Sequence, residues 1–237
     1  ICYLNGQFKI NHSSIVPRWL AVLPIAAYLA ARCRAGHEWR VKAFPAEELA
    51  LINRYFILSQ FCDWNTQTMI NPFSRLALDA GKKGEPFPLA EISRVAEQKN
   101  RTNVLHYHQF LAIPWLATKI LTPSRTYVFH ENKPQVDHIF PLNLAGADNE
   151  YRDRVDVLWN FQPMPAGVNN YKRARHPKEF FNSTDGGKYW EDYDFVPPAY
   201  SAIWDKPRLF VWSRHRKMRQ ALLKRYGLKL KRLREAK

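Results

Sequence analysis

The chain has 237 residues, 46% of them hydrophobic and 14% aromatic, and it carries a formal net charge of +15 at pH 7. This composition can bury a sizeable core in one or two domains, and it excludes a disordered chain. A transmembrane helix needs about 20 apolar residues, whereas the longest apolar run, residues 19–31, is shorter and is interrupted by Pro24.

Two features of the chain concern its context. It begins at Ile1 without the pattern of a signal peptide, so we expect it to be part of a longer polypeptide with a domain upstream. Its three cysteines, Cys2, Cys33 and Cys62, are far apart and lack the spacing of a metal site. They suit reduced thiols and a cytoplasmic location.

The first half of the chain predicts helices and contains no catalytic constellation. Prolines, acidic residues and capping residues mark the helix starts, and apolar residues recur with a helical period. The expected helices are one that begins near Pro24, one from about Pro45 to Cys62, one capped by Asn65 or Thr66 that runs through Leu78, one from about Leu89 to Gln98, and one over residues 104–121.

The central stretch, residues 134–177, predicts a strand, a loop, a second strand and a helix. Short apolar runs bounded by prolines favour strands, and a segment rich in Asn, Asp and Gly favours an exposed connection. In chain order we expect a strand around Asp137-His138 that stops at Pro141, a connection over residues 143–156, a strand that opens at Asn160, and a helix from Pro165 that carries Asn169 and Lys172.

The residue types in this stretch suit the hydrolysis of a phosphodiester. Asp137 offers a charged oxygen and Asn169 a neutral one, a set that prefers Mg²⁺ or Mn²⁺ over zinc and leaves other positions to water and phosphate. The unperturbed pKa of a histidine side chain lies near neutral pH, so the residue type of His138 suits a general base. Lys172, three residues after Asn169, could grip a phosphate, and Asn160 could hold the imidazole or the loop.

Each of these signals also has a plain structural explanation, because an Asp-His dipeptide is common and asparagines often form turns or helix caps. The order of the motif, the nine-residue spacing of the two asparagines and the lysine three residues later occur together here. That combination favours a genuine site.

The last part of the chain concentrates the positive charge. Residues 178–205 mix aromatic residues with Gly and Pro and are expected to form loops packed by their aromatic side chains. Residues 206–237 contain thirteen Lys or Arg and one acid, Glu235, so they hold a net +12 of the chain's +15. Apolar residues recur along one side, which predicts a helix with one docked face and one basic face, although a solvated helix has the same pattern.

A basic face beside a phosphodiesterase site would neutralise DNA phosphates without reading bases. Arg214 has an alternative role, because it lies early in the helix beside Trp212 and could brace the module by pairing with an acid. The residues expected to contact DNA are Lys172, Arg173, Arg214, Arg216, Lys217, Arg219, Lys224 and Arg225.

The order DHIFP, then NFQPMP, then N-x-x-K resembles the HNH (ββα-metal) nucleases. More narrowly, it is similar to the HNH half of GmrSD-type modification-dependent restriction endonucleases and related phosphorothioate-sensing phage-defence nucleases. The resemblance implies that His138 is the general base, that Asp137 and Asn169 are metal ligands, and that Asn160 is the structural asparagine. Many HNH proteins have His where this chain has Asn169, which favours magnesium, and the chain lacks paired CxxC knuckles.

The flanking segments LINRYFILSQF and RHRKMRQALLKRYGL also resemble that family, so the similarity extends over most of the chain. The resemblance further implies an upstream nucleotide-hydrolysing sensor domain. The motifs of such a domain are absent from this sequence.

The sequence thus predicts a mixed fold, mostly α: an α-helical domain over residues 1–125, an HNH ββα-metal core over 126–182, and an aromatic linker with a basic helix over 183–237, packed on the core. We expect metal-dependent cleavage or nicking of duplex DNA, phage or modified, by the effector part of a bacterial anti-phage restriction protein. Mg²⁺ or Mn²⁺ would be the cofactor, and no membrane partner is expected. Two alternatives stay open: a DNA-binding or scaffolding protein with a degenerate HNH fold, and an RNase or toxin-type nuclease.

Overall fold

The computed structural model describes residues 2–8, 10, 16–34, 44–122, 135–164 and 166–231. The described residues are mostly helical, with two small two-stranded sheets, which confirms the expected mostly α fold of mixed class. The chain forms two compact units, one of residues 1–12 and 114–222 and the other of residues 13–113 and 223–237. Residues 1–12 and 114–125, which the sequence assigned to the helical domain, therefore share a unit with the central stretch.

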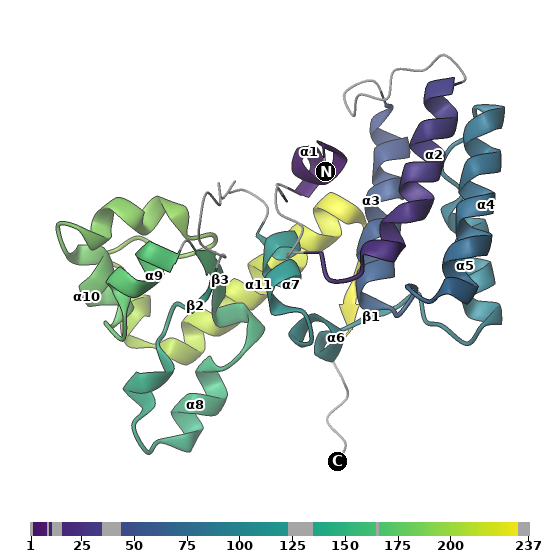
Figure 1. The fold of residues 1–237 in the computed structure, drawn as a ribbon. Coiled ribbons are helices and arrows are strands. Elements are labelled where there is room, and N and C mark those ends of the chain that lie inside the picture. Colours follow the sequence, from purple (N-terminus) through teal and green to yellow (C-terminus); the bar gives the residue numbers. More distant parts are fainter. Residues whose placement is uncertain are drawn as a thin grey trace. The chain divides into compact units, whose positions relative to one another are not determined.

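The unit of residues 13–113 and 223–237 is a helical bundle (Figure 1). After a 3₁₀ turn at Trp19–Val22, its helices are α2 (Leu23–Arg34), α3 (Ala46–Phe61), α4 (Gln67–Lys83), α5 (Leu89–Gln98) and the short α6 (Tyr107–Leu111). Helix α3 begins after Pro45 with two acidic residues in its first turn, where the helix dipole favours negative charge.

Helices α2 and α4 pack closely because Gly81 lies at their contact. A Cβ atom at Gly81 would lie 2.7 Å from the Cβ of Ala31 and 2.8 Å from the backbone oxygen of Tyr28. A residue with a side chain would push the two helices apart. Helix α4 runs past the predicted end at Leu78 and stops at Gly84, whose φ of 75° favours glycine.

The prediction of a single helix over residues 104–121 was wrong. Leu105–His106 forms strand β1, which pairs in parallel with β4 (Leu230–Lys231), and α6 follows it. A new helix, α7 (Pro114–Leu121), then begins in the other unit. Pro114 has no amide hydrogen and cannot continue the hydrogen-bond ladder of α6, which is the physical reason for the break.

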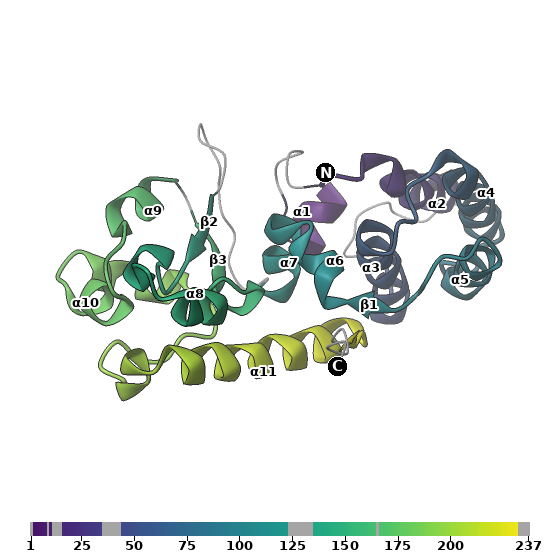
Figure 2. The ribbon, with the colours of Figure 1, turned by 90° about the horizontal axis from the view of Figure 1, so that it is seen from below.

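The unit of residues 1–12 and 114–222 contains the antiparallel pair β2 (Gln135–His138) and β3 (Phe161–Met164), in which His138 lies opposite Phe161. Helix α7 packs against both strands, and α9 (Ala166–Lys172) packs against β2. Figure 2 shows the antiparallel strands β2 and β3 side by side. The elements β2, β3 and α9 follow one another in the order that the sequence predicted.

The other elements of this unit surround that strand pair. They are α1 (Cys2–Phe8), α8 (Asn149–Val155), α10 (Pro177–Asn182), residues 207–222 of α11 (Pro207–Tyr226), and 3₁₀ turns at Leu142–Ala145, Leu158–Asn160, Gly186–Asp192 and Ala202–Asp205. The core that they enclose consists of Ile139, Phe140, Val155, Met164, Phe180, Phe181, Tyr193, Trp204 and Phe210.

Two segments that were expected to lack helix contain one. Within residues 143–156, helix α8 is capped by Asp148, whose side chain accepts a hydrogen bond of 2.9 Å from the amide of Tyr151. This helix has too few turns to display an apolar period, so the sequence pattern did not reveal it. Within residues 178–205, α10 runs through Asn182 before the irregular part of the segment begins.

Candidate active site

In strand β2 the side chains of Asp137 and His138 point to opposite faces, because successive side chains alternate along a strand. The side chain of Asp137 faces inward and is 4% exposed, whereas that of His138 is 27% exposed. The ring of His138 meets the ring of Phe161 edge-on, with centroids 4.7 Å apart. Water can therefore reach the imidazole, while the carboxylate belongs to a buried network.

Asn160 connects the two chain segments that flank the site. Its side-chain oxygen accepts a bond of 2.9 Å from the amide of Phe140, and its side-chain nitrogen donates to the backbone oxygens of Phe140 at 2.9 Å and Val155 at 2.8 Å. Because Asn160 is fully buried, these three bonds replace contacts that water would otherwise make. The residue holds the loop after β2, one of the two roles considered for it from the sequence.

The carboxylate of Asp137 is the centre of a buried network. It accepts bonds of 3.0 Å from Nζ of Lys172 and 2.9 Å from the hydroxyl of Tyr193, and the same Nζ donates to the backbone oxygen of His138 at 2.7 Å. Burial raises the pKa of the Asp137 carboxyl, while Lys172 and Tyr193 oppose that shift. Burial lowers the pKa of the Lys172 ammonium, and Asp137 opposes that shift in turn.

His138 has a carboxylate partner that the sequence reasoning missed. Its Nε2 lies 3.0 Å from Oδ1 of Asp156, the residue that follows α8. Asp156 was missed because it falls in a segment interpreted as an exposed connection. Tyr193, also missed, is 56 residues away from Asp137 in the sequence, and its residue type gave no signal of this contact.

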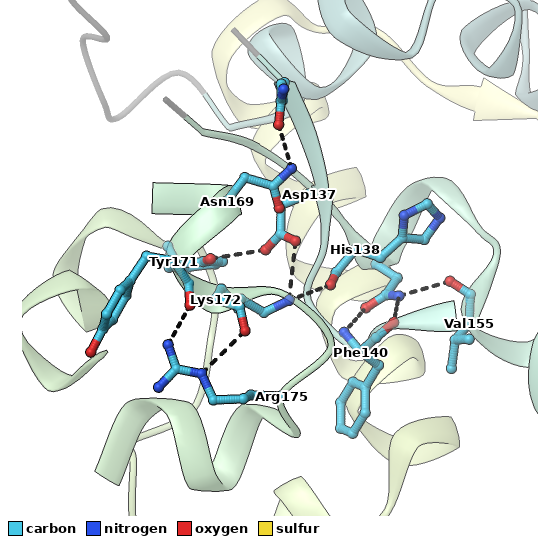
Figure 3. A network of polar contacts seen from close by, with 11 residues as sticks. Asp137, His138, Phe140, Val155, Asn169, Tyr171, Lys172 and Arg175 are labelled. Carbon is cyan, nitrogen blue, oxygen red and sulfur yellow. Dashed lines mark hydrogen bonds and ion pairs between the residues drawn. The ribbon is translucent and has the colours of Figure 1, made fainter. Parts of the chain in front are cut away.

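Asn169 lies on α9 beside Asp137 on β2 (Figure 3), so the fold brings the two predicted metal ligands together. Its Nδ2 donates a bond of 2.7 Å to the side chain of Gln135, which leaves the amide oxygen as the atom that a cation would bind. The Asp137 carboxylate has about four acceptor positions, of which Lys172 and Tyr193 take two. One charged and one neutral oxygen fit a weakly held, hydrated Mg²⁺ or Mn²⁺, and the nearby ammonium opposes it.

Within the ranges that the structure describes, no group of three or more His, Cys, Asp or Glu side chains is arranged to hold a metal ion. The expected magnesium site instead relies on one carboxylate and one amide. Any further ligands would be water and phosphate oxygens.

The predicted DNA-contacting cations divide into buried and exposed groups. Lys172 and Arg214 are both 0% exposed, so neither reaches a phosphate at the surface. Arg214 donates to the backbone oxygens of Trp159 and Phe161, both at 2.7 Å, and to Oε1 of Gln162 at 2.7 Å. It therefore braces α11 against β3 and the turn before it.

The remaining predicted cations are exposed. Trp212, which is 54% exposed, lies under the guanidinium of Arg216, 5.3 Å from the ring centroid. The exposed cations predicted to contact DNA are Arg173, just after α9, and Arg216, Lys217, Arg219, Lys224 and Arg225 on α11. Arg232, Arg234 and Lys237, counted in the basic segment, lie outside the described residues.

Across the described residues, no helix combines the length and apolar character needed to cross a membrane. A scan against protein-family models and a search of curated proteins both find no match for this chain.

Proposed function

We propose that this chain is an HNH-type endonuclease that hydrolyses or nicks DNA phosphodiester bonds. The observation that carries the proposal is the setting of His138. The imidazole is open to water at the end of β2, one ring nitrogen lies against Asp156, and Asn160 clamps the backbone that follows. A histidine held in this way can take a proton from an attacking water molecule.

The residues around His138 supply the rest of the chemistry. Asp137 and Asn169 would hold a divalent ion that, when bound, neutralises charge on the scissile phosphate. Lys172 fixes the end of β2 through its bond to the backbone oxygen of His138, so its role is to position the base. Asn160 does the same from the other side of the loop.

The exposed cations on α11 support DNA as the substrate. Their side chains are exposed and form the basic surface of this helix, whereas Phe210, Met218 and Leu222 on the same helix are buried. Exposed lysine and arginine side chains bind the phosphates of DNA whatever its base sequence. The wider role, as the effector part of a cytoplasmic anti-phage restriction protein with an upstream sensor, rests on the resemblance of the motifs alone.

A DNA-binding protein that does not cleave is the second candidate. It is favoured by one specific observation, the contact between the Lys172 ammonium and the carboxylate that a metal would need. In such a protein, the buried pair would serve stability and the basic face would still bind DNA.

Nicking of supercoiled plasmid in Mg²⁺ by the wild type and by His138→Ala tests the proposal. We expect the variant to lose activity by about 10²–10⁴-fold while folding and DNA affinity are retained, because the general base is removed. His108→Ala, which changes an exposed histidine in the other unit, is the matched control and is expected to cleave as the wild type does.

The outcomes separate the candidates. Equal cleavage by wild type and His138→Ala contradicts the assignment of the base. DNA binding without cleavage by the wild type supports the non-catalytic candidate, and cleavage of RNA in place of DNA supports the ribonuclease alternative.

A further inference from the structure

We propose that Asp156 is a positioning residue for His138, which keeps the proton of the neutral imidazole on Nε2 and turns Nδ1 toward the attacking water. The inference rests on the proposed function, because it assigns the base a fixed tautomer. The contact that carries it is the 3.0 Å distance between Nε2 of His138 and Oδ1 of Asp156.

The chemistry of the pair determines which nitrogen acts as the base. A carboxylate only accepts hydrogen bonds, so the nitrogen that it contacts must carry the hydrogen. A neutral imidazole has one N–H group, and its lone pair is then on Nδ1. Without this acceptor, both tautomers would be populated, and part of the protein would present an N–H group to the water.

The side chain of Asn160 holds the backbone near both His138 and Asp156. Asn160 binds the backbone of Phe140, two residues after His138, and the backbone of Val155, one residue before Asp156. The amide of Asp156 also donates a bond of 2.8 Å to the backbone oxygen of Arg152 at the end of α8. The separation of the two side chains is therefore set by a buried bridge, even though Asp156 itself is 53% exposed.

The ring plane of His138 is restricted from a second direction. Phe161 faces it across the β2–β3 pair, and the two rings make an angle of 76°. The contact with Phe161 limits rotation of the imidazole. The hydrogen bond to Asp156 determines which ring nitrogen faces the carboxylate. Together they fix an orientation that a lone surface histidine would lack.

The first test measures the tautomer of His138 directly, by ¹⁵N NMR of the ring nitrogens in the full chain. The pH is set above the range in which histidines are protonated. His138→Ala assigns the signal by its disappearance. We expect Nε2 to carry the proton in the wild type, and we expect a mixture of tautomers in Asp156→Ala. Asp153→Ala, an exposed acid on α8 near Asp156, is the matched control and should keep the wild-type signal.

The second test measures plasmid cleavage by the same proteins. We expect Asp156→Ala to lower kcat by about 10–100-fold with KM unchanged, the range typical of carboxylates that orient metal-bound histidines, and Asp156→Glu to restore part of the rate. Asp153→Ala should have the wild-type kcat. The unchanged KM distinguishes a misoriented base from weaker DNA binding.

The two readouts distinguish failure of this inference from failure of the proposed function. An unchanged tautomer in Asp156→Ala overturns the inference, whatever the rates. A changed tautomer in Asp156→Ala, together with a wild-type protein that does not cleave DNA, supports the positioning role and rejects the nuclease function. A changed tautomer with an unchanged kcat shows that the tautomer does not matter for the reaction, which also overturns the inference.

Discussion

At the scale of single residues, the most constrained side chain of the site is Asn160. Its three hydrogen bonds satisfy the amide and the oxygen of Phe140 and the oxygen of Val155, all in a region without access to water. An alanine at this position would leave three buried polar groups without these partners. Each such group costs about 1–3 kcal/mol.

We therefore expect Asn160→Ala to lower the free energy of unfolding by at least about 3 kcal/mol, measured by urea denaturation. Asn143→Ala, which changes an exposed asparagine in the same unit, is the control and should change stability by no more than about 0.5 kcal/mol. A decrease below about 1 kcal/mol in Asn160→Ala would show that the loop does not depend on this bridge.

The pair of Asp137 and Lys172 is the second residue-scale feature. Both side chains are buried, so removing one leaves the other without its charge partner. We expect Lys172→Met to destabilise the protein by about 3–5 kcal/mol, whereas Arg173→Met, which truncates an exposed neighbour, should have little effect.

The double variant Asp137→Asn with Lys172→Met completes the cycle. Since it removes both charges together, it should be more stable than Lys172→Met alone. Chemical denaturation of the wild type, the two single variants and the double variant measures the coupling. A double variant whose destabilisation equals the sum of the single ones would mean that the two side chains do not interact.

At the scale of elements, α11 has two faces with different roles. Its buried face carries Arg214, which donates to backbone oxygens around β3, and its exposed face carries Arg216, Lys217 and Arg219. A charge on the first face contributes to folding, and a charge on the second is available to phosphates.

We expect changing Arg216, Lys217 and Arg219 together to Gln to flatten the slope of log affinity against log salt by about 0.9 for each phosphate that the variant no longer binds, for every DNA sequence alike. Fluorescence anisotropy across a salt series measures this slope. Arg214→Met is the comparison: we expect it to lower the melting temperature and to leave the slope unchanged. An unchanged slope in the triple variant, with intact folding, would mean that this face of α11 does not bind DNA.

At the scale of the whole molecule, the site is formed by elements far apart in the chain. Strand β2 provides Asp137, α9 provides Asn169, and Tyr193 comes from the segment after α10. A metal site built from two protein oxygens beside an ammonium is expected to be weak, since most of its ligands must come from water and from the DNA itself.

Metal dependence follows from this arrangement. We expect EDTA to abolish plasmid nicking and added Mg²⁺ or Mn²⁺ to restore it, with little heat of Mg²⁺ binding by calorimetry in the absence of DNA. Tight binding of zinc together with nicking that is insensitive to magnesium would reject Asp137 and Asn169 as the ligands.

The sequence by itself determined the local elements of this protein. Apolar periods and proline punctuation located α3, α5 and α9, because these signals depend on near neighbours. The prediction of one helix over residues 104–121 failed because a new helix begins at Pro114. Helix α8 was missed because it is too short to show an apolar period. The residue types of Asp137 and His138 also pointed to one site.

Only the tertiary structure decided which charges are buried and which partners they have. Lys172 and Arg214 have the same residue types as exposed cations, and sequence spacing does not reveal that Lys172 meets Asp137 or that Arg214 meets β3. Asp156 and Tyr193 came to the site through long-range packing, since 18 residues separate Asp156 from His138 and 56 separate Tyr193 from Asp137. Burial and long-range contacts depend on how the elements pack, which a local pattern of residues does not encode.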